Sequence, residues 1–169
     1  MENGVDHRSM LCPVVRGDCI LLCRRPATDI WVLPRGSPRR SEGAWECARR
    51  EVSQETGLAI TPDRVAFVLD ATSLKGEQHL FEIIFSATEN DPSAMPRGRE
   101  DQLAPSFVQL DALRDLVLLP PIGEQLRAFV ERSPDRVAET APYLGNVWGT
   151  IPEPGSTAMK SLETGGPLR

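Results

Sequence analysis

Two glutamates four residues apart, Glu51 and Glu55, are the residues of this chain best placed to do chemistry together. A helix turns about 100° per residue, so the two carboxylates project only about 40° apart on one face. Gln54 lies about 60° to the other side of Glu51 and adds an amide oxygen. Oxygen ligands of this kind, with no His or Cys among them, suit Mg²⁺ or Mn²⁺. The sequence therefore indicates a divalent-metal site on one face of a helix.

The surrounding sequence predicts the helix that must carry these residues, over positions 43–56. An adjoining apolar arc can be buried and consists of Ala44, Trp45, Ala48 and Val52. Gly57 follows, where glycine commonly ends a helix in the left-handed conformation. An ordinary amphipathic helix with a charged outer face would have the same arc and the same glycine. It would not account for the spacing of the loop ahead of the helix.

That spacing begins at Gly36, reaches Glu42 after five residues, and after seven more gives Arg-Glu-Val-Ser-Gln-Glu-Thr-Gly-Leu, ending at Leu58. The 23-residue segment resembles a Nudix box, the signature of hydrolases that cleave a diphosphate linked to another moiety. One defining position departs from the family pattern. The family usually has two adjacent Glu residues before Thr-Gly, and this chain has Gln54 followed by Glu55.

The resemblance implies a pyrophosphohydrolase with Mg²⁺ as cofactor, or Mn²⁺ as a substitute, that cleaves a nucleoside diphosphate linked to group X into nucleoside monophosphate and phosphorylated X. It implies that Glu55 ligates the metal, that Glu51 is a ligand or general base, and that the Gly36 carbonyl completes the metal shell. Arg50 and Glu42 are expected to brace the loop and helix by charge-assisted hydrogen bonds. Without the motif, each would be interpreted as part of an ordinary surface ion pair.

Gln54 leaves two questions open. A neutral amide can ligate metal but brings no charge, so we expect weaker binding, fewer metals, or help from another carboxylate. Members of this family often recruit an acid from the loop after the later strands, and Glu100 in the loop 89–105 is the candidate metal ligand here; it can equally be a solvated charge. Gln54 is also the one sequence feature that favours a different function, a non-catalytic nucleotide-sensing or regulatory module. Intact Glu51 and Glu55 favour the enzyme.

Three further residues are predicted to bind substrate. Arg24, at the end of a predicted strand beside Arg25, and Arg35, in the loop that enters the motif, can each bind phosphate through a planar guanidinium. Glu82 interrupts an apolar strand sequence, so its carboxylate should face either solvent or the substrate cleft. The expected substrate is a small diphosphate, a nucleotide derivative whose identity the box does not specify.

The remaining sequence predicts the strands and helices that position the motif. We expect a hairpin of residues 10–15 and 19–24, strands over 30–33, 65–71, 80–88 and 106–110, and a packing helix over 122–132. Together with the resemblance, this order indicates an α/β fold, the Nudix α/β/α sandwich with a mixed sheet between helices. We expect one domain over 1–151, including an apolar segment, Tyr143–Trp148, docked on it, and a flexible tail over 152–169.

Composition restricts the partners. The net charge is −5, from 19 basic and 24 acidic residues, so general nucleic-acid binding, including binding of capped RNA, is not expected. No long apolar run is present, so no membrane association is expected either. Four cysteines without a CxxC pair favour a reduced protein, and a cytoplasmic monomer or homodimer is the expectation.

Overall fold

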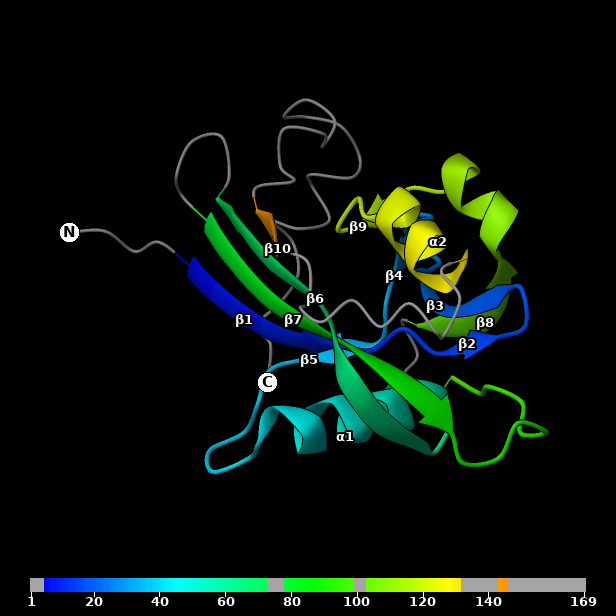
Figure 1. Ribbon diagram of the computed structural model, residues 1–169, viewed down its shortest axis with the longest axis horizontal. Helices are drawn as coiled ribbons and strands as arrows, with labels where there is room; N and C mark the ends of the chain where they lie inside the picture. The colour runs from blue at the N-terminus through cyan, green and yellow to red at the C-terminus, as the bar shows by residue number, and fades with distance from the viewer. Residues whose placement is uncertain (1–4, 73–77, 99–102, 132–142, 146–169) are drawn as a thin grey trace.

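The computed structural model describes residues 5–72, 78–98, 103–131 and 143–145. Its strands form two sheets, and its helices lie on two sides of them (Figure 1). The first sheet has the order β10-β6-β7-β1-β5. Its strands are β1 (Val5–Leu11), β5 (Arg35–Gly36), β6 (Ile60–Thr72), β7 (Gln78–Glu89) and β10 (Tyr143–Gly145). The sheet is mixed, because β1 runs parallel to β7 while β6 and β7 form a long antiparallel hairpin.

The second sheet is smaller and has β3 at its centre. It contains β2 (Val15–Arg16), β3 (Cys19–Arg25), β4 (Ile30–Val32), β8 (Ala104–Gln109) and β9 (Leu118–Leu119). β3 pairs antiparallel with β2, β4 and β8. β4 pairs in parallel with β9. The chain therefore passes from the second sheet, through β5 in the first sheet, directly into the motif helix.

Helices complete the sandwich. The motif helix α1 (Ala44–Thr56) lies below the sheets in Figure 1, and α2 (Gly123–Glu131) lies on the other side with the 3₁₀ helix η1 (Leu110–Asp115). The predicted α/β fold, with a mixed sheet between helices, is confirmed, although the strands are divided between two sheets. No helix in the described part of the chain is long and apolar enough to span a membrane.

The predicted pairing of the first strand was wrong. The segment 10–15 does not form a hairpin with 19–24, because residues up to Leu11 belong to β1 and pair with β7 in the other sheet. Pro13 has no N–H to donate to a ladder, and the chain leaves β1 just before it. Only Val15 and Arg16 form the hairpin with β3, around Gly17 at φ 58°.

Other element predictions are confirmed or lie outside the described residues. Gly57 ends α1 in the left-handed conformation, at φ 73°, and donates its N–H to the Ser53 carbonyl at 3.0 Å. β10 pairs in parallel with β6. Residues 146–148 and the predicted tail 152–169 lie outside the described residues, so the domain boundary at 151 stays a prediction.

The core has two main clusters, and α1 packs on one of them. Its buried apolar side chains are Cys47, Ala48 and Val52, in contact with Leu21, Phe85 and others. Trp45 does not join this core as fully as predicted; it is 46% exposed and tilts against Phe85 with ring centroids 5.8 Å apart. Glu55 is buried as well, because at about 100° per residue it lies between Ala44 and Ala48 on the side of the helix that packs on the core.

Candidate active site

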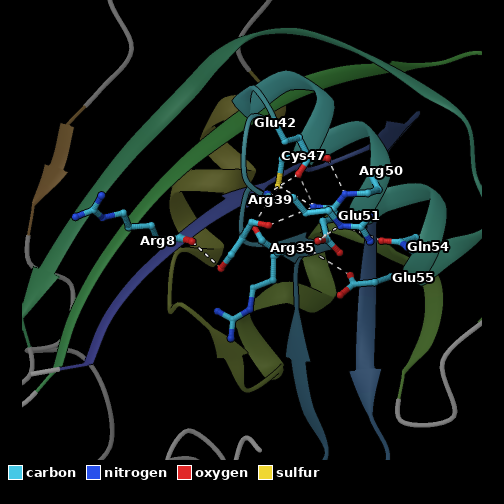
Figure 2. A network of polar contacts seen from close by, with 11 residues as sticks. Arg8, Arg35, Arg39, Glu42, Cys47, Arg50, Glu51, Gln54 and Glu55 are labelled. Atoms are coloured by element: carbon cyan, nitrogen blue, oxygen red, sulfur yellow. Dashed lines mark hydrogen bonds and ion pairs between the residues drawn. The ribbon is translucent and has the colours of Figure 1, made fainter. Parts of the chain in front are cut away.

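Arg50 joins the motif loop to the motif helix (Figure 2). Its Nε and Nη2 donate to the two carboxylate oxygens of Glu42, each at 2.7 Å, and Nη2 also donates to the Ser37 carbonyl at 3.2 Å. Nη1 donates to Glu51 and, at 2.9 Å, to Oε1 of Gln54. The predicted bracing contact between Arg50 and Glu42 is therefore bidentate, the strongest geometry available to an arginine and a carboxylate.

The Glu42 carboxylate is ionised in this network. Hydrogen bonds from Arg50 and then from the Arg39 backbone N–H, which lies 2.8 Å from Oε2, lower the pKa of Glu42 to about 2. The same contact with Glu42 raises the pKa of Arg50. The loop between Gly36 and Glu42 is consequently held to the helix by groups that stay charged across the physiological pH range.

The Glu51 side chain occupies the space in which a side chain at position 36 would lie. A Cβ added to Gly36 would lie 2.7 Å from Glu51 Cγ and closer still to the carboxyl group. On the helix side, the Cys47 thiol donates to the Gly36 carbonyl at 3.5 Å, and burial raises the pKa of this thiol to about 11, so it stays protonated. The Gly36 backbone and the Glu51 carboxylate are thus in direct contact.

Glu55 lies nearby, on the end of α1 that faces β5. Its side chain is 7% exposed, and its Oε2 accepts a hydrogen bond from the Arg35 backbone N–H at 3.1 Å. Gln54 is exposed on the adjoining side of the helix. Gly36, Glu51 and Glu55 are therefore brought together by the β5–α1 junction, with Gln54 beside them through their shared contact with Arg50.

These residues fit a hard divalent cation. The donor set is two carboxylates and one backbone carbonyl, all oxygens, and the contact of Glu51 with Gly36 needs the space that a Cβ would fill. Within the described ranges, no three His, Cys, Asp or Glu side chains form a ready-made metal cluster. Glu51 and Glu55 are instead held by Arg50 and by the Arg35 backbone. The fourth predicted ligand, Glu100, lies outside the described residues.

The loop before Glu100 is fixed by a residue that sequence reasoning missed. Arg16 donates Nε to Glu89 Oε1 at 3.0 Å and Nη2 to the Ala94 carbonyl at 2.8 Å, and its guanidinium lies 4.1 Å from the centre of the Phe107 ring. Further along the loop, the Arg97 N–H donates to the Thr56 carbonyl at the end of α1, at 2.8 Å. The described part of the loop, 90–98, is thus attached to the hairpin and to the motif helix.

Arg24 and Arg25 face different environments. Arg24 is exposed and donates Nε to Asp29 at 2.6 Å. For Arg25, burial and the positive charge of Arg35 lower the pKa, and the negative charge of Glu55 opposes this. Arg25 therefore shares the electrostatic environment of Arg35 and Glu55. Side chains alternate along a strand, so only one of two consecutive residues can point to the site. This alternation is the sequence feature that could have indicated that only one of the two arginines faces the site.

Glu82 does not face solvent, one of the two environments that the sequence left open. It is fully buried on β7, opposite Ser9 of β1 and Leu69 of β6. Arg35 Nη1 lies 3.2 Å from its Oε1, whereas Oε2 has no partner among the described residues. Burial raises the pKa of Glu82 to about 7, and the charge and hydrogen bond of Arg35 oppose that rise. Arg35 thus connects Glu55, through its backbone, with Glu82, through its side chain.

The raised pKa of Glu82 predicts a specific pH dependence of stability. Between about pH 4.5 and 7 the folded protein binds more protons at Glu82 than the unfolded chain does, so this carboxyl lowers stability as the pH rises. At about 1.4 kcal/mol per pH unit, the effect is on the order of 3 kcal/mol. Glu82→Gln should therefore gain stability relative to wild type between pH 5 and pH 8 in urea unfolding. An equal difference between the two proteins at both pH values would contradict the prediction.

Comparisons with known proteins show the family and the fold. A family model described as the NUDIX domain matches residues 5–132. No curated protein sequence matches the chain significantly. Among solved structures, the chain is similar to an ADP-ribose pyrophosphatase from Streptococcus suis, with 20% identity, a TM-score of 0.62, and coverage of 80% of this chain and 96% of that one.

Two further structures show the same fold. A MutT NUDIX hydrolase from Burkholderia pseudomallei is 25% identical, with a TM-score of 0.54 and coverage of 63% of this chain and 84% of that one. A UDP-X diphosphatase is 21% identical, with a TM-score of 0.53 and coverage of 66% and 54%. Because the family model spans more than half of the chain and includes the whole motif, this protein belongs to the Nudix family of hydrolases.

Proposed function

We propose that the protein is a Mg²⁺-dependent pyrophosphohydrolase that cleaves a nucleoside diphosphate linked to a group X into nucleoside monophosphate and phosphorylated X. The observation that carries the proposal is the packing of the Glu51 carboxylate against Gly36, beside a buried Glu55 held by the Arg35 backbone. Such a set of oxygens suits a cation that must also contact phosphate oxygens.

The side chains divide the work of the reaction. Mg²⁺, when bound by Gly36, Glu51 and Glu55, would neutralise charge on the diphosphate and make an attacking water more acidic. Glu51 would also accept a proton from that water, and Arg50 keeps its carboxylate oriented by a charge-assisted hydrogen bond. Gln54 would contribute its amide oxygen at the edge of the site, and Glu100 a further carboxylate.

The substrate's diphosphate would be bound by arginines on the other side of Glu55. Arg35 donates its backbone N–H to Glu55, and Arg25 lies where the charges of Glu55 and Arg35 act on it. The planar guanidinium groups of the two arginines suit an anion with several equatorial oxygens. Arg24 remains a predicted contact for the distal part of the substrate, and its ion pair with Asp29 would have to rearrange. A cytoplasmic location and a monomeric or homodimeric state stay predictions.

A substrate panel tests the function. The names of the similar structures suggest ADP-ribose and UDP-linked compounds, to which dinucleoside polyphosphates can be added. Each compound would be incubated with the protein and Mg²⁺ or Mn²⁺, and nucleoside monophosphate would be measured by chromatography. Metal-dependent release of monophosphate is expected. Nucleotide binding without hydrolysis of any compound would favour the alternative, a nucleotide-sensing or regulatory module.

The two carboxylates should be required for turnover. Glu51→Gln and Glu55→Gln each remove a charge from the metal site, and we expect turnover to fall by about 10²-fold or more. Glu46→Gln, which changes an exposed glutamate of the same helix, is the matched control and should turn over normally. Wild-type turnover in both site variants, with the metal still required, would show that the site lies elsewhere.

Gly36→Ala should separate catalysis from folding. The new Cβ displaces the flexible end of Glu51 and not backbone, so we expect a small change in melting temperature. A displacement of about 1 Å in a catalytic group can cost about 10²-fold in rate, and we expect a loss of that order. Gly123→Ala, whose Cβ would make contacts of 3.6 Å or longer, is the control. Normal turnover in Gly36→Ala would contradict the assigned position of Glu51.

Gln54→Glu should tighten metal binding. The substitution adds a carboxylate next to Glu51 and Glu55 at a position that already hydrogen-bonds Arg50. An added anionic ligand lowers the dissociation constant of a hard cation, so turnover at limiting Mg²⁺ should rise while turnover at saturating Mg²⁺ changes less. A Mg²⁺ titration of both proteins measures this. Unchanged metal affinity with a raised KM would instead place Gln54 against the substrate.

A further inference from the structure

Glu82 has an unusual position for a carboxylate. It is fully buried and lies on the same side of β7 as Ile84, a residue of the largest apolar cluster, and Leu80, which packs against that cluster. Its neighbours in register are Ser9 and Leu69. Only one of its two oxygens has a partner in the described part of the chain. A polar group in such a place needs a physical explanation.

Stability does not supply that explanation. A buried ion pair generally stabilises no more than apolar side chains of similar volume, because both charges lose hydration. The pair of Glu82 and Arg35 is also incomplete, since Glu82 Oε2 is buried without a hydrogen bond. The effect of Glu82 must therefore be sought in what it does to Arg35.

Arg35 is held at both ends. Its backbone N–H is bonded to Glu55 at 3.1 Å, and its guanidinium is bonded to Glu82 at 3.2 Å. The arginine side chain is 19% exposed, so part of it reaches the surface although its partner Glu82 is fully buried. Glu82 accepts a hydrogen bond from one of the five N–H donors that a guanidinium carries.

We propose that Glu82 is a positioning residue, which fixes the guanidinium of Arg35 so that its remaining donors face the diphosphate of the substrate. The inference rests on the proposed function of this site, and it adds which residue orients one of the side chains that bind the phosphates. One donor is directed to Glu82, and the planar fork then fixes the direction of the others. A guanidinium ordered in advance loses less conformational entropy when the anion binds.

The test compares binding of α,β-methylene-ADP, a diphosphate analogue whose P–C–P bridge is not hydrolysed. Its dissociation constant would be measured with Mg²⁺ at pH 8 by isothermal titration calorimetry. Glu82→Leu removes the acceptor and should weaken binding by about 10-fold, the effect of losing one charge-assisted contact. Glu82→Gln keeps an acceptor oxygen and should stay within about 3-fold of wild type.

Glu89→Leu is the matched control. Glu89 is also a nearly buried carboxylate of β7 paired with an arginine, and in the described residues its hydrogen bonds go to Arg16 alone. This control should melt at a lower temperature and bind the analogue normally. Glu82→Leu should show the opposite pattern, with weaker binding and no loss of melting temperature, which a purely structural role would not give.

A double-mutant cycle tests whether Glu82 acts through Arg35. Arg35→Leu alone should weaken binding, and adding Glu82→Leu to it should weaken binding no further. Additive losses would overturn the proposal, as would binding by Glu82→Leu that equals or exceeds that of wild type. Calorimetry needs no turnover, so this result is separate from the substrate panel. If wild type hydrolyses a compound of the panel and Glu82→Leu binds the analogue normally, the inference alone is refuted. If wild type hydrolyses no compound, the proposed function alone is refuted.

Discussion

The bidentate ion pair between Arg50 and Glu42 is the interaction on which the geometry of the site depends. The loop of residues 37–43, between β5 and α1, has little regular structure of its own, so its position is set by what it binds. Arg50 fixes it to α1 through Glu42 and the Ser37 carbonyl, and the same guanidinium orients Glu51. One side chain thus couples loop position to carboxylate position, and a shift in either would move the other.

Charge buried beside the helix is the second feature of the site. Glu55 and Glu82 both leave water, which is unfavourable unless each gains hydrogen bonds. Each has one from Arg35, to Glu55 through the backbone N–H and to Glu82 through the guanidinium. This arrangement places anionic oxygens and cationic donors close together in a region of low dielectric, where each would act more strongly on the proposed diphosphate substrate than it does in water.

The division of the strands between two sheets explains why this meeting point exists. β3 ends near the site with Arg25, β5 enters the motif with Arg35, and β7 crosses behind with Glu82. β3 belongs to the second sheet, whereas β5 and β7 belong to the first, with β1 between them. β7 begins only at Gln78, far along the chain from the other two strands. The motif helix supplies carboxylates to the same point from one side, so the site lies where both sheets and α1 converge.

Local spacing was enough to predict the parts of the site that lie on one element. Glu51, Gln54 and Glu55 share a helix, its glycine C-cap follows from backbone sterics, and the motif fixes Gly36 and Glu42 relative to that helix. The later strands followed from patterns of apolar residues, because hydrophobic periodicity acts over a few residues. The mixed α/β fold followed from the order of these elements together with the family resemblance. The sequence therefore determined the family and the motif residues.

Only the tertiary structure decided which residues from distant segments meet. It left Arg24 exposed in an ion pair with Asp29 and placed Arg25 where the charges of Arg35 and Glu55 act on it. It moved the segment up to Leu11 into the other sheet. It also paired Glu82 with Arg35, 47 residues away, and placed Arg16 on the loop after β7. Contacts between distant segments depend on long-range packing and on the burial of charge, and neither leaves a periodic signal in the local sequence.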